Sequence, residues 1–104
     1  MGALANRALR GQHQRRMSAR VRLYSTSYCG YCFLAKRLLR KRGIPFDEID
    51  VTSDRAARAR VVAETGHRTV PVIFIDDRFI GGSDELHELD AAGQLQGLRE
   101  PAAS

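Results

Sequence analysis

The chain has 104 residues, 43% hydrophobic and 28% charged, with two cysteines; this allows one small domain and excludes a multidomain enzyme or a disulfide-stapled secreted scaffold. The net charge of +5 arises in residues 1–20, which hold five arginines and no acid, whereas residues 21–104 contain twelve bases and twelve acids. The neutral body lacks the basic face that nucleic-acid binding requires, and no run of about 18 apolar residues is present to span a membrane.

Residues 1–20 show no sustained periodicity and are rich in Arg, Ala and Gln. We expect them to form a basic, disordered tail, followed by a single domain over residues 21–101. Two other interpretations stay open. Translation could start at Met17, or the segment could be an organelle-targeting peptide, a class that is also Arg-rich and acid-poor.

The first half of the body predicts two strands joined by a helix. Residues 21–24 alternate in polarity and are typical of a short strand. Residues 31–39 then carry apolar side chains at the spacing of one helix face, and Gly43 ends that helix. Residues 46–51 form the second strand, which a crossover helix of this length makes parallel to the first.

The second half predicts a helix, a hairpin and a final helix. Ser53 or Asp54 can cap a helix that runs to about Glu64. The apolar run over residues 72–75 is typical of a strand buried on both faces, and a tight turn leads into a strand over residues 78–80.

The last helix begins at Ser83 and ends near Gly93. The order β-α-β-α-β-β-α predicts a mixed four-stranded sheet flanked by helices on both faces, which is a three-layer α/β sandwich.

Both cysteines lie in the motif Cys29-Gly30-Tyr31-Cys32, between the first strand and the first helix. The unpaired N–H groups and the positive end of the helix dipole stabilise an anion at this position. In Cys-x-x-Cys sites at helix starts the thiol pKa falls from about 8.5 to about 3.5–7.5. We therefore expect Cys29 to be a nucleophilic thiolate and Cys32, one turn further in, to be shielded and able to form a reversible disulfide with it.

Half of a zinc site is the structural alternative for the two cysteines. Zinc would need two more ligands, and the histidines His13, His67 and His87 form no second pair with zinc-finger spacing. The sequence therefore favours a redox pair and no metal site. We expect His87 to be an exposed helix residue.

Several motifs resemble those of the glutaredoxins of the small dithiol class, over residues 21–101. They are Tyr24-Ser25, the Cys29–Cys32 motif, Gly43-Ile44-Pro45-Phe46, residues 69–75 (Thr-Val-Pro before the buried strand) and residues 80–86 with Gly-Gly-Ser-Asp at a helix start. The resemblance implies a thioredoxin-like fold and a glutathione-dependent enzyme that reduces protein–glutathione mixed disulfides and protein disulfides.

The resemblance also implies a role for individual residues. Cys29 would attack the glutathione sulfur, and Cys32 would resolve mixed disulfides with protein substrates. Glutathione would lie against Tyr31, against the backbone of Val70 before a cis Pro71, and against the helix start that follows the last strand. The implied glutathione-binding residues are Tyr31, Arg68, Thr69, Val70, Pro71, Gly82, Ser83 and Asp84.

The chain departs from this family pattern at two positions. Gly30 stands where many members have Pro, and some relatives without that Pro resemble dimeric carriers of a [2Fe–2S] cluster, held by the first cysteine and glutathione. A cluster-bridged dimer ligated by Cys29 is therefore the alternative to a monomeric enzyme. Thr26 replaces a Lys that meets the glycyl carboxylate, a charge that Arg68 or the pair Lys36-Arg37 would have to supply.

Three further expectations concern surfaces and partners. We expect the basic run over residues 36–42 and the acids Asp47, Glu48 and Asp50 to be solvent-facing, and Tyr28 and Phe33 either to shape a docking surface or to join the core. The expected partners are glutathione and disulfide-containing or glutathionylated proteins, in the cytoplasm. A second rival is an electron donor served by a thioredoxin-type reductase.

Overall fold

The computed structural model describes residues 19–99, so the expectations for residues 1–18 lie outside the described part of the chain. The elements follow one another in the predicted order. They are β1 (Val21–Ser25), α2 (Gly30–Lys41), β2 (Phe46–Asp50), α3 (Arg55–Thr65), β3 (Val72–Ile75), β4 (Arg78–Gly81), α4 (Ser83–Ala91) and a short 3-10 helix, η2 (Gln96–Leu98).

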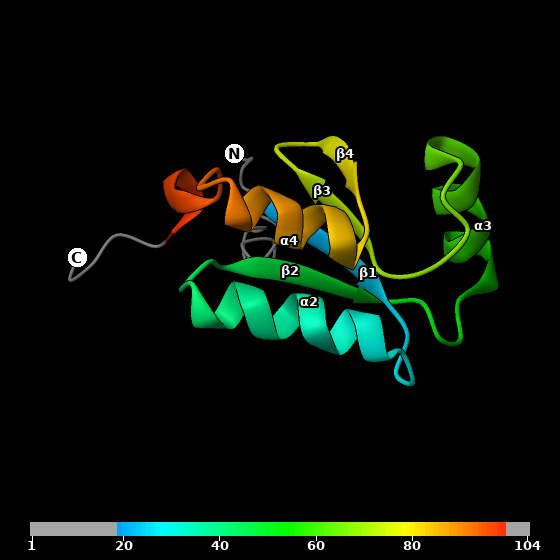
Figure 1. Ribbon diagram of the computed structural model, residues 1–104. Coiled ribbons are helices and arrows are strands. Elements are labelled where there is room, and N and C mark those ends of the chain that lie inside the picture. Colours follow the sequence, from blue (N-terminus) through cyan, green and yellow to red (C-terminus); the bar gives the residue numbers. More distant parts are fainter. Residues whose placement is uncertain (1–18, 100–104) are drawn as a thin grey trace, which may run out of the picture.

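The strands form one mixed sheet in the order β2-β1-β3-β4. Strand β1 pairs in parallel with β2 and antiparallel with β3, and β3 and β4 form the predicted antiparallel hairpin. Helices α2 and α4 lie together on one face of the sheet, and α3 lies on the other (Figure 1). The predicted three-layer, thioredoxin-like sandwich is therefore confirmed.

Side-chain alternation along the strands builds a core on each face. Val21, Leu23 and Ile73 point toward α2 and α4, whereas Val72 and Phe74 point toward α3. Strand β3 is buried on both faces, as its apolar run predicts, because each successive side chain enters the opposite core. The larger core consists of Val21, Leu23, Ala35, Leu38, Leu39, Ile44, Ile73, Leu86 and Leu95.

Capping residues delimit the helices close to the predicted positions. The Asp54 carboxylate accepts a hydrogen bond from the N–H of Ala57 (3.0 Å) at the start of α3, and Gly66 ends the same helix. Arg42 follows α2 and donates to both carboxylate oxygens of Asp90 in the last turn of α4, at 2.7 and 2.9 Å. This ion pair joins the ends of two neighbouring helices.

Contacts of the folded body begin before Val21. The Arg20 guanidinium pairs with the Asp76 carboxylate (Nε to Oδ1, 2.7 Å) and donates to the carbonyl of Gly97 at 3.2 Å. Within residues 19–99, the helices are all too short or too polar to cross a lipid bilayer.

Candidate active site

The thiol of Cys29 lies where β1 and its following turn meet helix α2. Cys29 is the extended residue directly before the helix, and its Sγ accepts a hydrogen bond from the N–H of Cys32 at 3.0 Å. The same sulfur lies 3.4 Å from the carbonyl oxygen of Val70, to which the thiol donates. Both cysteines are free thiols, and Cys29 is partly exposed. The Cys29 sulfur therefore meets one of the N–H groups that have no partner within the first turn of a helix.

The second thiol occupies a different environment. Cys32 is only 1% exposed and packs in the first turn of α2. Burial, together with a hydrogen bond to Cys29, raises the pKa of Cys32 to about 12. Cys32 is therefore a protonated thiol at neutral pH, and it lies three residues after the partly exposed thiol of Cys29.

A cavity of about 360 Å³ lies beside Cys29. It is bounded by the start of α2, by the segment between α3 and β3, and by the start of α4. The predicted glutathione-binding residues, all but Arg68, line this one cavity. Its lining residues are Tyr31, His67, Thr69, Val70, Pro71, Gly82, Ser83, Asp84 and Glu85.

Two backbone features lie at the walls of this cavity. The Val70–Pro71 peptide bond is cis, and the Val70 carbonyl contacts Cys29. Gly82 passes close to the same segment, since a Cβ atom at Gly82 would lie only 3.2 Å from the Pro71 carbonyl oxygen. Glycine permits this close approach of two backbones.

The start of α4 forms the polar end of the cavity. Ser83 is buried and Asp84 is exposed. The Glu85 carboxylate accepts the N–H of Gly82 at 2.8 Å, and this hydrogen bond holds the pKa of Glu85 below its ordinary value. A helix start with free N–H groups suits a carboxylate, and the Asp84 side chain suits an ammonium group.

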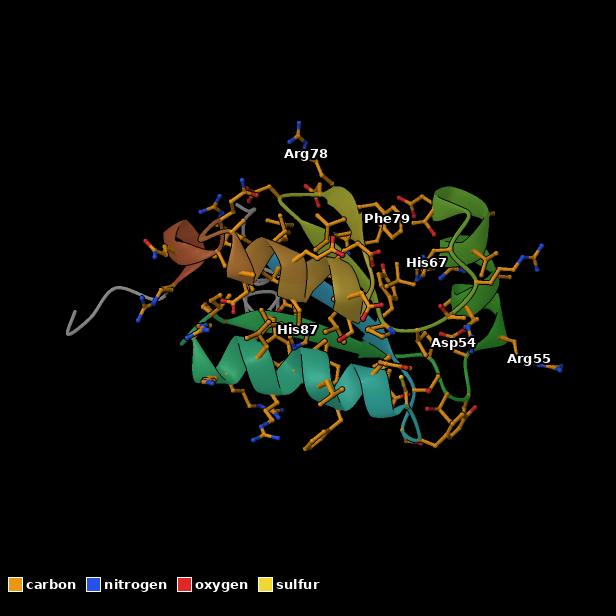
Figure 2. All side chains as sticks on the ribbon, viewed as in Figure 1. Asp54, Arg55, His67, Arg78, Phe79 and His87 are labelled. Carbon is orange, nitrogen blue, oxygen red and sulfur yellow. The ribbon has the colours of Figure 1, made fainter. Side chains whose placement is uncertain are left out.

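Two lining residues, His67 and Glu85, are absent from the predicted set. His67 packs edge-on against Phe79 of β4 with ring centroids 5.5 Å apart, and its Nε2 lies 3.3 Å from Thr69 Oγ1 (Figure 2). The sequence feature that could have identified His67 is its position between Gly66 and Thr69, in the segment already expected to line the site. The contact with Phe79 joins two separate elements, which local sequence does not reveal.

The cations proposed for the glycyl carboxylate lie outside the cavity lining. Arg68 is exposed, and its carbonyl accepts a hydrogen bond from Arg58 at 3.2 Å. Lys36 is paired with Glu48 at 2.8 Å, and Arg37 is exposed. Glu48 is exposed, as expected, but β2 places it on the same sheet face as Phe46, toward α2, where it pairs with Lys36.

Two aromatic residues close to Cys29 in the chain are exposed. Tyr28 and Phe33 are 77% and 57% exposed, so they are surface residues and not part of the core. His87 is exposed, as predicted. Within residues 19–99, no three His, Cys, Asp or Glu side chains gather in a way that would hold a metal ion.

Comparison with known proteins agrees with the site. The family model described as Glutaredoxin matches residues 21–80. Glutaredoxin 3 of Escherichia coli K12 is 42% identical over 80 residues, which are 77% of this chain and 96% of that protein. The glutaredoxin of Pseudomonas aeruginosa is 41% identical over 78 residues, covering 75% of this chain and 93% of that protein.

A solved structure of similar shape is the buckwheat glutaredoxin–glutathione complex, with a TM-score of 0.74 and 31% identity over 91% of this chain and 94% of that one. The holo form of glutaredoxin C1 from poplar (Populus tremula x tremuloides) has a TM-score of 0.71 and 34% identity, covering 78% of this chain and 83% of that one. With its Cys-x-x-Cys pair at a helix start, the chain belongs to the glutaredoxin family of thiol–disulfide oxidoreductases.

Proposed function

We propose that Cys29 attacks the glutathione sulfur of a protein–glutathione mixed disulfide. A new disulfide forms between Cys29 and glutathione, and the protein substrate leaves as a thiolate that takes up a proton. A second glutathione thiolate then attacks the glutathione sulfur on Cys29, which releases oxidised glutathione and regenerates the Cys29 thiolate. The observation that carries this proposal is the partly exposed Cys29 sulfur, which contacts a helix N–H and the Val70 carbonyl at the edge of a 360 Å³ cavity.

The cavity is the proposed glutathione site. The backbone of Val70 would pair with the cysteinyl part of glutathione, and Tyr31 would pack beside it. Ser83 and the start of α4 would hold the γ-glutamyl carboxylate, with Asp84 on the ammonium group. Arg68, exposed at the edge of this segment, is proposed for the glycyl carboxylate. The match of these charges to the ends of the tripeptide supports the assignment.

Cys32 is proposed as the resolving thiol for protein disulfides. Attack of Cys29 on such a substrate leaves a mixed disulfide, and Cys32 then attacks Cys29 to release the second substrate thiol. Its burial and raised pKa, about 12, support this order of events. A protonated inner thiol does not compete with Cys29 for the first attack.

We further propose a metal-free monomer that works in the cytoplasm, where glutathione is kept reduced. The alternative is a [2Fe–2S] dimer bridged through Cys29. Anaerobic purification with glutathione separates the two: a colourless monomer is expected, whereas a brown dimer bleached by Cys29→Ser would support the cluster.

Two single substitutions test the proposed thiol roles. Cys29→Ser is expected to abolish turnover of every substrate, because no nucleophile remains. Cys32→Ser is expected to keep activity on a glutathione mixed disulfide and to lose activity on a protein disulfide. The measurement is steady-state turnover of both substrates with glutathione as reductant. An equal loss of activity on the mixed disulfide in both variants contradicts the assigned thiol roles. Turnover that requires a thioredoxin-type reductase would show that glutathione is not the reductant.

A further inference from the structure

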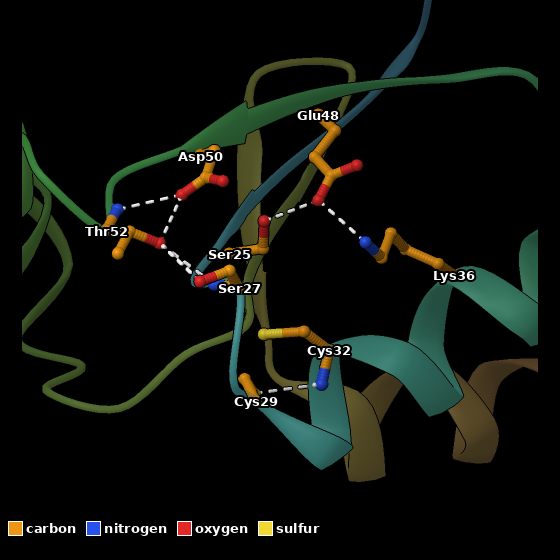
Figure 3. A network of polar contacts seen from close by, with 8 residues as sticks. All are labelled: Ser25, Ser27, Cys29, Cys32, Lys36, Glu48, Asp50 and Thr52. Atoms are coloured by element: carbon orange, nitrogen blue, oxygen red, sulfur yellow. Dashed lines mark hydrogen bonds and ion pairs between the residues drawn. The ribbon is translucent and has the colours of Figure 1, made fainter.

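A network of polar contacts joins three elements beside the buried thiol of Cys32 (Figure 3). Lys36 of α2 donates from Nζ to Oε2 of Glu48 in β2, at 2.8 Å. Ser25, the last residue of β1, donates from Oγ to the same carboxylate oxygen at 2.6 Å. One oxygen atom therefore holds both a buried hydroxyl and an ammonium group in fixed positions.

Lys36 differs from the other cations of its helix. It follows Cys32 by four residues, so the two side chains lie on the same face of α2. The Lys36 side chain is only 20% exposed, whereas Arg37 and Lys41 are exposed. Figure 3 shows the Lys36 ammonium and the Cys32 sulfur on the side of the helix that faces the strands. A solvated helix face does not account for a lysine in this position.

We propose that Lys36, held in place by Glu48 and Ser25, is a positioning residue for the resolving step, in which its positive charge favours the thiolate of Cys32. This inference rests on the proposed role of Cys32 in reducing protein disulfides. In that step Cys32 loses its proton and its sulfur bonds to Cys29. The bond between Cys29 and the substrate sulfur breaks, and the departing substrate thiolate takes up a proton, so no other reactant is needed.

Charges around Cys32 act in both directions. Burial and the hydrogen bond with Cys29 raise its pKa, while a backbone hydrogen bond at Thr26 and the charge of Lys36 lower it. The charged or titratable groups that act on this region are Cys29, directly before α2, Lys36 from α2, and Glu48 and Asp50 from β2. Partial burial alone would raise the pKa of Glu48, but its hydrogen bonds from Lys36 and Ser25 keep that pKa below the ordinary value. Glu48 is thus an anion that fixes Lys36 and partly offsets its charge.

The expected size of the effect follows from thiol chemistry. Each unit by which the pKa of a buried thiol falls gives about tenfold more thiolate, and lower nucleophilicity reduces the gain in rate to about threefold. The charge of Lys36 is the smallest of the influences on the pKa of Cys32, because it acts from one helical turn away and is partly offset by Glu48. Removing the Lys36 charge is therefore expected to slow the resolving step modestly, by about threefold.

The test follows this single step in the full chain. Cys29 is first converted to its mixed disulfide with thionitrobenzoate, and release of the coloured thiol by Cys32 is measured as a function of pH. Lys36→Met is expected to slow release by about threefold and to displace the rate–pH curve to higher pH. Lys36→Arg, which keeps the positive charge, is expected to release the coloured thiol at the rate of the unmodified sequence. Lys41→Met, which removes the same charge from an exposed position of the same helix, is the matched control and leaves the rate unchanged.

Glu48→Gln supplies a prediction of opposite sign. The amide oxygen still accepts hydrogen bonds from Ser25 and Lys36, but the negative charge is gone, so release should become faster and its curve should move to lower pH. A purely structural role predicts that both Lys36→Met and Glu48→Gln slow release. That result, or equal rates for Lys36→Met and Lys41→Met, overturns the proposal.

A further variant separates the inference from the function on which it rests. If Cys32→Ser releases the coloured thiol as fast as the unmodified sequence, the resolving role of Cys32 is wrong. If Cys32→Ser blocks release but Lys36→Met does not slow it, the resolving role stands and the role of Lys36 is wrong. Should Lys36→Met fail to fold, the sign of the Glu48→Gln effect decides.

Discussion

The turn between β4 and α4 shows how single residues shape the cavity. Gly81 has a φ of +121°, a conformation that side-chain-bearing residues rarely adopt. A Cβ atom there would lie 2.6 Å from Cγ of Glu85, whose carboxylate caps the N–H of Gly82. The missing side chain at Gly81 thus leaves room for the group that organises the start of α4.

Gly81→Ala is therefore expected to lower the free energy of unfolding by about 1–3 kcal/mol, through backbone strain and displacement of the Glu85 cap. Gly93→Ala is the matched control, because Gly93 also has a positive φ (74°) but no atom within 4 Å of the added Cβ. The loss of stability in Gly93→Ala should be smaller, since the added Cβ atom meets no side chain there. Urea unfolding measures both, and equal losses would contradict a role for Glu85.

At the scale of elements, the ion pair between Arg42 and Asp90 ties the end of α2 to the end of α4. Hydrogen bonds from Arg42 hold the pKa of Asp90 below its ordinary value. A carboxylate whose pKa is lower in the folded state stabilises the fold above its unfolded pKa of about 3.9. The stabilisation is lost as the pH falls through the folded pKa, because the protonated acid no longer pairs with Arg42.

Asp90→Asn is accordingly expected to unfold at lower urea concentration than the unmodified sequence at pH 7. The difference should shrink as the pH falls below about 4. Glu88→Gln, at an exposed position of the same helix, is the control for a change of charge alone. A deficit of Asp90→Asn that stayed constant between pH 7 and pH 3 would show that the ionised carboxylate is not its source.

For the whole molecule, the sheet separates two cores of unequal size. The core under α2 and α4 includes Leu39 and Ile73, both fully buried, whereas α3 contributes Val61 to a smaller cluster with Val72 and Phe74. The larger core supports the helix that begins at Cys29. The smaller one anchors the helix that leads into the cis-proline segment.

Truncations in the two cores should therefore differ in cost. Leu39→Ala is expected to lower the free energy of unfolding by about 2–5 kcal/mol, because the truncated side chain leaves an empty space in the larger core. Val61→Ala removes less apolar surface and is expected to cost about 1–2 kcal/mol. Chemical unfolding of both variants gives the comparison. A Val61→Ala loss as large as that of Leu39→Ala would show that the α3 face carries the stability.

Local sequence determined the elements and the position of the reactive pair. The alternation along β1, the helical spacing after Cys29 and the continuous apolar run of β3 each depend on residues close together in the chain. Asp54 and Gly66 ended α3 within a residue of the predicted limits for the same reason. The motifs around Cys29, Pro71 and Gly82 also indicated, through family resemblance, which distant segments meet.

Tertiary packing alone decided which side chains from different elements contact one another. Only the parallel register of β1 and β2 turns Glu48 toward Lys36, and only the approach of β4 places Phe79 against His67 at the cavity. Arg68, expected at the same place from its position in the chain, lies outside the lining because the backbone there presents His67 and Thr69 instead. Side-chain direction in such segments depends on partners far away in the chain, and no local pattern of polarity encodes that choice.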